Sequence, residues 1–125
     1  MKTLLLITLL LLSGCHEPVW AMELTASWYS VESLKAEGTY KDSQGITASG
    51  TVFADNDMTC ATRLYPLGSL VCVTNIENNK KVYVEVTDRI GKRFANTRID
   101  LSKKAFSNIA GLEQGIIRVR VEKID

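Results

Sequence analysis

Two aspartates, Asp88 and Asp100, have the residue type and the setting that acid/base chemistry needs. Each ends an apolar run and has an arginine nearby, Arg89 after the first and Arg98 before the second. A carboxyl group at the end of a strand can reach a groove while the sheet fixes its position, as both proton transfer and polysaccharide binding require. The alternative is that both are turn or capping aspartates that pair with these arginines. The residues alone leave both interpretations open.

Other common patterns of catalytic and metal-binding residues are missing from the sequence. The only histidine is His16, in the N-terminal region, and no Cys/His cluster has the spacing of metal ligands. We therefore expect no metal site, no cofactor, no histidine-based triad and no activated cysteine. The formal net charge of +1 and the lack of a basic run also argue against a nucleic-acid partner.

The N-terminal residues predict export from the cytoplasm. Lys2 is followed by the apolar run 4–12, which is shorter than the roughly 20 residues that a membrane span needs. The run ends in Leu-Ser-Gly-Cys15, which resembles the bacterial lipoprotein box, where the cysteine receives the lipid and becomes the new N-terminus. The alternative is ordinary cleavage after Ala21, which yields a soluble secreted protein.

This N-terminal pattern divides the chain into three parts. Residues 1–15 are expected to be the lipoprotein signal peptide, residues 16–23 a short tether and residues 24–125 one domain. The residue after Cys15 is His16 rather than the aspartate that marks retention in the inner membrane. We therefore expect an outer-membrane lipoprotein that faces the periplasm and is held by an N-terminal lipid anchor.

Two further cysteines, Cys60 and Cys72, each lie within an apolar run of the domain. In an oxidising compartment they can form a disulfide. They can equally be small buried side chains that pack as apolar groups. Their spacing does not distinguish the two interpretations.

Short strands are the elements expected to position the two aspartates. Strand-like runs cover residues 24–30, 47–53, 57–63, 69–75, 80–87 and 117–121. Residues 31–46 are expected to form a long loop with at most one helical turn. A short helix is expected from its N-cap Ser102 to a stop at Gly111. Six or seven short strands and one helix in about a hundred residues predict a small closed barrel or a sandwich.

A series of short motifs in chain order resembles one known family. They are Ala26-Ser27-Trp28-Tyr29, Thr47-Ala48-Ser49-Gly50, Met58-Thr59-Cys60-Ala61, Pro66-Leu67-Gly68-Ser69, Val73-Thr74-Asn75, Asp88-Arg89 and Ile99-Asp100-Leu101-Ser102. Together they are similar to the RlpA-like (rare lipoprotein A) double-psi β-barrel over residues 24–123. The resemblance implies a mainly β fold, a six-stranded barrel with one or two short helices and a groove across one face.

The resemblance also implies an activity, which is lytic cleavage of peptidoglycan glycan strands by a monomer. In that reaction a carboxylic acid protonates the glycosidic oxygen, and the 6-hydroxyl of muramic acid attacks to give a 1,6-anhydro end. Asp88 and Asp100 are the expected catalytic residues, and Arg89 and Arg98 their positioning partners. The adjacent aromatic residues Trp28 and Tyr29 are expected either to contact the sugar or to pack in the core.

The sequence departs from the family pattern at two positions that matter for catalysis. Thr51 stands where the enzymes usually have a glutamate, and Thr62 where they usually have a histidine. Both threonines are expected to line the groove without supplying an acid or an imidazole. The sequence also ends soon after the last strand, so no separate glycan-binding domain is expected.

These departures favour a second resemblance. The segment 87–106 with its two aspartates is also similar to the first domain of expansins, which loosen wall polysaccharides without hydrolysing them. The alternative function is therefore a non-lytic module that binds peptidoglycan.

Overall fold

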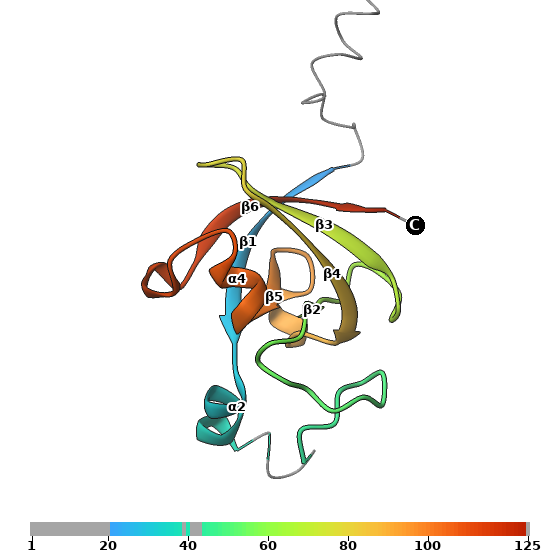
Figure 1. Cartoon of the computed structure of the whole chain (residues 1–125). Coiled ribbons are helices and arrows are strands. Elements are labelled where there is room, and N and C mark those ends of the chain that lie inside the picture. The colour runs from blue at the N-terminus through green and yellow to red at the C-terminus, as the bar shows by residue number, and fades with distance from the viewer. Residues whose placement is uncertain (1–20, 39, 41–43, 125) are drawn as a thin grey trace, which may run out of the picture.

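The computed structural model describes residues 21–38, 40 and 44–124. Its strands are Met22–Tyr29 (β1), Thr59–Ala61 (β2), Leu70–Asn75 (β3), Lys81–Asp88 (β4), Arg98–Ser102 (β5) and Ile117–Lys123 (β6). Its helices are Val31–Glu37 (α2) and Lys103–Ser107 (α4), with 3-10 turns at Lys92–Phe94 (η1) and Leu112–Gln114 (η2). The strands close into one barrel in the order β1-β5-β2-β4-β3-β6, which confirms the predicted six-stranded barrel (Figure 1).

The strands of the barrel that alternate most clearly in sequence are also those with the most regular burial. Val82, Val84 and Val86 of β4 are buried, whereas the residues between them are exposed. β3 is buried from its second residue onward and pairs antiparallel with β4. The turn between them includes Asn79 at φ 62°, a left-handed conformation that asparagine adopts more readily than most residues. The expected strand-like runs 69–75 and 80–87 therefore form a hairpin.

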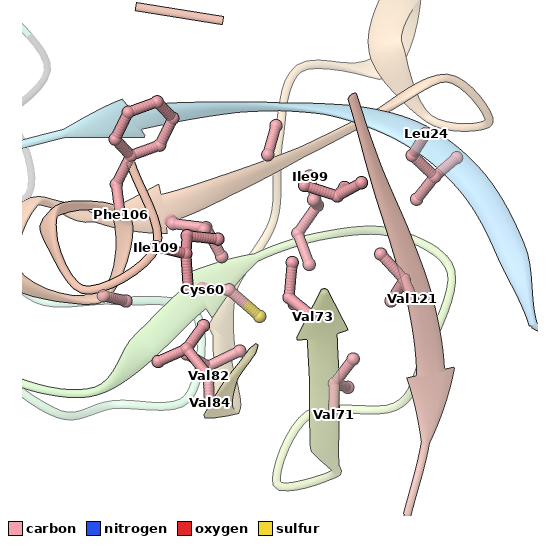
Figure 2. Close-up of a cluster of buried hydrophobic side chains, with 14 of the residues drawn as sticks. Leu24, Cys60, Val71, Val73, Val82, Val84, Ile99, Phe106, Ile109 and Val121 are labelled. Carbon is pink, nitrogen blue, oxygen red and sulfur yellow. The ribbon is translucent and has the colours of Figure 1, made fainter. Parts of the chain in front are cut away.

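The core fills the barrel and continues under α4. Figure 2 shows side chains from several strands, including Val71, Val73 and Ile99, in the same buried cluster as Phe106 and Ile109. The hydroxyl oxygen of Ser102 accepts a hydrogen bond from the backbone N–H of Ala105, so the predicted N-cap of α4 is confirmed. The helix ends at Ser107, however, because the chain turns at Asn108 well before Gly111, and the expected stop at Gly111 is wrong.

Two segments near the groove differ from the sequence prediction. Residues 31–37 form the helix α2 rather than a loop, because Ser30 and Ser33 make a reciprocal capping box at its start. Residues 47–53 do not form a strand, and only Ile46 and Val52 bridge to one another. Glycines at positive φ let this segment fold back on itself instead, at Gly45 (φ 78°) and Gly50 (φ 90°).

Two of the six strand pairings are parallel, and both join strands that are distant in sequence. β1 pairs with β5, and β2 pairs with β4. β2 also lies antiparallel to β5, so β5, β2 and β4 are consecutive neighbours around the barrel. The first strand starts at Met22, inside the segment that was expected to be a tether.

The two cysteines of the domain are free and buried. β4 lies between the strands that carry Cys60 and Cys72, which puts their Cα atoms roughly 10 Å or more apart, and a disulfide rarely spans more than about 7 Å. Of the two alternatives, the disulfide is therefore wrong and the packing role holds. Within residues 21–38, 40 and 44–124, no helix is long and apolar enough to cross a membrane. The predicted lipidation site, Cys15, lies outside the described residues.

Candidate active site

The two predicted catalytic aspartates lie in one row across the outside of the barrel. Ala61 on β2 is in register with Asp100 on β5 and with Asp88 on β4. On the other side of β5, Asp100 is in register with Ser27 of β1. Two strand spacings put the Cα atoms of the aspartates roughly 10 Å apart. Only a methyl group, that of Ala61, stands between them in the row.

A β-bulge aims Asp88 at this row. Because Val82, Val84 and Val86 point inward, simple alternation would send Asp88 inward as well. One step along β2, from Cys60 to Ala61, matches two steps along β4, from Val86 to Asp88. The extra residue is Thr87, which is buried and has a hydroxyl group without a hydrogen-bond partner. The bulge therefore reverses the alternation and turns the carboxylate outward.

A second, smaller apolar cluster forms the floor beside the row. It consists of Tyr29, Phe53, Ala61 and Ile90, with Val31, Leu34 and Phe94 packed against it. Two adjoining pockets of about 430 and 450 Å³ open over this cluster, and Asp100 lines both of them. Asp88 lines the second pocket together with Ala61. The two pockets together form a continuous groove that passes over the row of aspartates.

Asp100 has the environment of a carboxyl group that keeps a proton. Burial raises the pKa of Asp100 from its usual 3.8 to about 6, and the negative charge of Glu37 acts in the same direction. The Ser27 hydroxyl donates a hydrogen bond of 2.9 Å to its Oδ1, and this bond and Arg98 lower the pKa in part. A carboxyl group tuned in this way can donate a proton near neutral pH and take it back afterwards.

Asp88 has a different environment from Asp100. Its Oδ1 accepts hydrogen bonds from the backbone N–H groups of Ala48, at 3.1 Å, and Arg89, at 2.9 Å. The backbone N–H of Ser49 donates to the carbonyl of Thr87 beside it. These bonds anchor the 44–53 segment to the end of β4. Asp88 therefore fixes the position of a loop at the edge of the groove.

Tyr29 lies in the floor of the groove and lines both pockets. Its ring stacks on Phe53 with centroids 4.5 Å apart, and its buried hydroxyl group has no hydrogen-bond partner. Burial raises the pKa of Tyr29 strongly, and the charges of Asp88 and Asp100 raise it further. Tyr29 therefore stays a neutral phenol. Of its two expected roles, packing in the floor is the one that its burial supports.

The two arginines predicted to pair with the aspartates differ in their contacts. The guanidinium group of Arg89 donates to the backbone carbonyls of Thr62 and Tyr65, both at 2.7 Å, so it holds the chain after β2 rather than the carboxylate of Asp88. The guanidinium carbon of Arg98 lies 4.3 Å from the centroid of the Phe94 ring. Arg98 also lines the first pocket and lowers the pKa of Asp100, as a partner of that carboxyl group is expected to do.

Three further predicted contact residues occupy distinct places. Trp28 packs against the main core and donates from its indole N–H to the carbonyl of Leu112 at 3.0 Å, although it also lines the first pocket. Thr62 is fully buried and its hydroxyl accepts the N–H of Leu64, so it does not line the groove. Thr51 is exposed and shares hydroxyl hydrogen bonds with Thr47 and Ser49 beside the groove, not in its lining.

The structure adds groove residues that the sequence analysis did not select. Glu37, at the end of α2, lines both pockets, and Arg93 and Phe94 of η1 line the first. One signal for Glu37 is present in the sequence, the Ser30–Ser33 spacing of a capping box, which starts the helix that ends at Glu37. Among the described residues, no group of three His, Cys, Asp or Glu side chains could hold a metal ion.

A closed barrel with two parallel crossings and a groove over one face defines a double-psi β-barrel. The family model described as "Lytic transglycolase" matches residues 21–121. The chain is 42% identical over 101 residues, 81% of its length, to the endolytic peptidoglycan transglycosylase RlpA of Pseudomonas aeruginosa (strain UCBPP-PA14). It is 40% identical over 113 residues, 90% of its length, to the protein of the same name from Haemophilus influenzae. The chain therefore belongs to the RlpA-like family of double-psi β-barrels.

The matched region is only part of these relatives. It covers 27% of the P. aeruginosa protein and 36% of the H. influenzae protein. Among solved structures, the Streptomyces papain inhibitor has a TM-score of 0.65 at 21% identity, over 86% of this chain and 96% of that one. A Clavibacter michiganensis expansin in complex with cellohexaose has a TM-score of 0.58 at 21% identity, over 84% of this chain and 50% of that one. At these identities the likeness concerns the fold.

Proposed function

We propose that this protein cleaves the glycan strands of peptidoglycan and leaves 1,6-anhydro-muramoyl ends, with Asp100 as the acid and then the base. The observation that carries the proposal is the row of Asp100, Ala61 and Asp88 in an open groove, with the pKa of Asp100 raised to about 6. The names of the P. aeruginosa and H. influenzae relatives support the same reaction.

The proposed reaction needs only one proton-transfer group. Asp100 gives its proton to the glycosidic oxygen, and the bond from that oxygen to C1 breaks with its electron pair on the oxygen. The 6-hydroxyl oxygen of the same muramic acid bonds to C1, and its proton goes to Asp100. The carboxyl group ends as it began, so no water molecule and no covalent enzyme intermediate is required.

Asp88 is proposed to shape the groove rather than to transfer the proton. Its hydrogen bonds to the N–H groups of Ala48 and Arg89 hold the 44–53 segment, whose Gly45 and Ile46 line the second pocket. A glycan chain lying across both pockets would then contact this segment next to Asp100. Fixed positions of such groups are a large part of the rate that enzymes achieve.

The decisive experiment incubates the purified protein with glycan strands stripped of stem peptides and searches for anhydro ends by mass spectrometry. We expect such ends from the wild type and a loss on the order of 10³-fold in the Asp100→Asn variant, because general acid catalysis contributes about that much. Asp88→Asn keeps an acceptor oxygen for both N–H groups and is expected to cut more slowly but measurably. Anhydro ends made at the wild-type rate by Asp100→Asn would refute its assignment.

A second candidate function is a non-lytic module that binds and loosens the wall. The observation in its favour is the pair of threonines, Thr51 and Thr62, at the family's usual glutamate and histidine positions. The expansin neighbour, which shares the fold, was solved in complex with cellohexaose, and this supports glycan binding as a function. In the same experiment this function predicts co-sedimentation with the wall and no new ends.

The proposed site of action is the cell envelope. Cys15 at the end of the apolar N-terminal run is proposed to carry the lipid that anchors the protein in the outer membrane. Cleavage after Ala21 is the alternative, and it leaves a soluble protein. The intact mass of the mature protein separates the two, since lipidation adds acyl chains to residue 15 and cleavage after Ala21 removes that residue.

A further inference from the structure

Glu37 occupies a place in the groove that the row of aspartates does not explain. It is the last residue of α2, and the helix lies beyond the end of the barrel rather than within the sheet (Figure 1). Glu37 lines both pockets, and so does Asp100. The two aspartates project from the sheet, whereas Glu37 approaches from a helix. A sugar chain that passes through both pockets therefore has carboxyl groups from two strands and one helix around it.

The position of Glu37 is not explained by the stability of α2. A negative charge at the C-terminal end of a helix is unfavourable, because the last carbonyl groups carry partial negative charge. Glu32 in the first turn and Lys35 in the last turn both follow the favourable arrangement. Glu37 is exposed and goes against it. Its charge is thus placed where the groove, rather than the helix, can use it.

We propose that Glu37 is the second carboxylate of the reaction centre, which stabilises the positive charge that develops at C1 while Asp100 transfers the proton. The proposal rests on the proposed cleavage of glycan strands. When the bond between C1 and the glycosidic oxygen breaks, the sugar ring becomes electron-poor, and a nearby negative charge lowers the energy of that state. Glu37 forms no bond and transfers no proton in this scheme.

Glu37 would supply a carboxylate that the family pattern usually places at position 51. The usual glutamate position is Thr51, whose hydroxyl bonds to Thr47 and Ser49 outside the pocket lining. Glu37 comes from a different element and reaches the same groove. The pair then has the division of labour that glycosidases use, with one half-buried carboxyl group that keeps a proton and one exposed carboxylate. The charge of Glu37 also raises the pKa of Asp100.

The test compares two isosteric variants on the same helix. Glu37→Gln removes the charge in the groove, and Glu32→Gln removes a charge that lies in neither pocket lining. We expect Glu37→Gln to cut peptide-free glycan strands about 10²-fold more slowly, with the same Kd for the intact strand in the inactive Asp100→Asn background. Glu32→Gln is expected to cut at the wild-type rate. Circular dichroism melting of both variants monitors the helix.

The pH dependence of the cleavage rate distinguishes this role from a purely structural one, which would leave that dependence unchanged. Removing the charge of Glu37 lowers the pKa of Asp100, so the high-pH limb of the rate profile should shift to lower pH. The other charged or titratable groups near Asp100 are unchanged by the substitution. They are Tyr29 of β1, Cys60 of β2, Asp88 of β4, Arg89 after β4, Arg98 of β5 and Arg93 of η1. Glu32→Gln is expected to leave the limb in place.

The outcomes separate this inference from the function on which it rests. A Glu37→Gln variant with the wild-type rate overturns the role of Glu37 and leaves the cleavage function intact. A variant that melts earlier and cuts more slowly, but keeps the wild-type pH limb, also overturns it. Wild-type protein that leaves no anhydro ends overturns the cleavage function itself, and the role of Glu37 with it.

Discussion

The two ends of the carboxylate row differ in what holds each side chain. At one end, Asp100 is half-buried and receives one side-chain hydrogen bond, from Ser27, and its pKa is raised to about 6. At the other end, Asp88 accepts two backbone N–H groups on a single oxygen. The first environment disfavours the charged form of its carboxyl group. The second uses the carboxyl oxygen as a fixed acceptor for the backbone.

This difference shows that similar sequence settings can produce different chemical roles. Both aspartates have an arginine nearby in the sequence, but Asp88 ends β4 whereas Asp100 lies in the middle of β5, so the expected strand end at Asp100 is wrong. Only Arg98 acts on its neighbouring carboxyl group. Arg89 binds backbone carbonyls instead. The pKa of Asp100 is raised mainly by burial and further by the charge of Glu37, which comes from an element far from Asp100 in sequence. Mutations at the two ends should therefore have effects of opposite sign on stability.

The largest expected effect is a gain in stability when Asp100 is replaced by asparagine. The folded protein holds the proton of Asp100 more tightly than the unfolded chain, so the wild type loses stability as the pH rises from about 3.8 to about 6. Above that pH range the wild type has lost no more than about 3 kcal/mol of its free energy of unfolding through this group. The Asp100→Asn variant should therefore have the same free energy of unfolding as the wild type near the bottom of that pH range, and a larger one at pH 7. Urea unfolding at the two pH values measures this, and a less stable variant at pH 7 would contradict it.

A smaller effect of the opposite sign is expected at the other end of the row. Asp88→Ala removes the acceptor of two N–H groups and should cost about 2 kcal/mol of unfolding free energy. The loss should appear locally as faster hydrogen exchange at the Ala48 amide. The Ser49 amide, which donates to the Thr87 carbonyl, provides the internal reference. Unchanged protection at Ala48 would show that Asp88 does not anchor the segment.

The smallest expected effect is a change in the pKa of Asp100 when its hydrogen-bond donor, Ser27, is replaced. The Ser27 hydroxyl stabilises the charged form, so Ser27→Ala should raise the pKa of Asp100 further. The high-pH limb of the cleavage profile should then move to higher pH, opposite to the shift expected for Glu37→Gln. A limb that moved to lower pH would mean that the hydrogen bond from Ser27 favours the protonated form.

Most of the barrel was predictable because its strands carry their pattern locally, but β5 (Arg98–Ser102) was not among the expected strands. Val82, Val84 and Val86 alternate with polar residues, and Ser102 caps a helix whose Phe106 is buried. The segment 47–53 was not predictable in this way, although its residues favour strands. Its backbone is folded back by hydroxyl groups and glycines that bond within the segment and to β4. In this segment, local hydrogen bonding outweighs the strand propensity of the residues.

The candidate site was predictable in its residues but not in its arrangement. Asp88 and Asp100 were recognisable from their positions after apolar runs, but the bulge at Thr87 that turns Asp88 outward depends on pairing with β2. Thr62 was expected to line the groove, but it is fully buried, and nothing in the neighbouring sequence reveals this burial. Glu37 was missed because its role depends on where a short helix lies against the barrel, which is a tertiary property.

The parallel pairing of β1 with β5 has a consequence for when the groove can exist. Ser27 and Asp100, which share a hydrogen bond, are separated by 73 positions in the chain. Contacts between such distant residues form slowly, because the chain must close a long loop before it gains their stabilisation. The groove cannot assemble until β5 is free to lie between β1 and β2. A chain that is still being synthesised, or is threaded through a membrane pore, therefore carries no working site until nearly all of it has emerged.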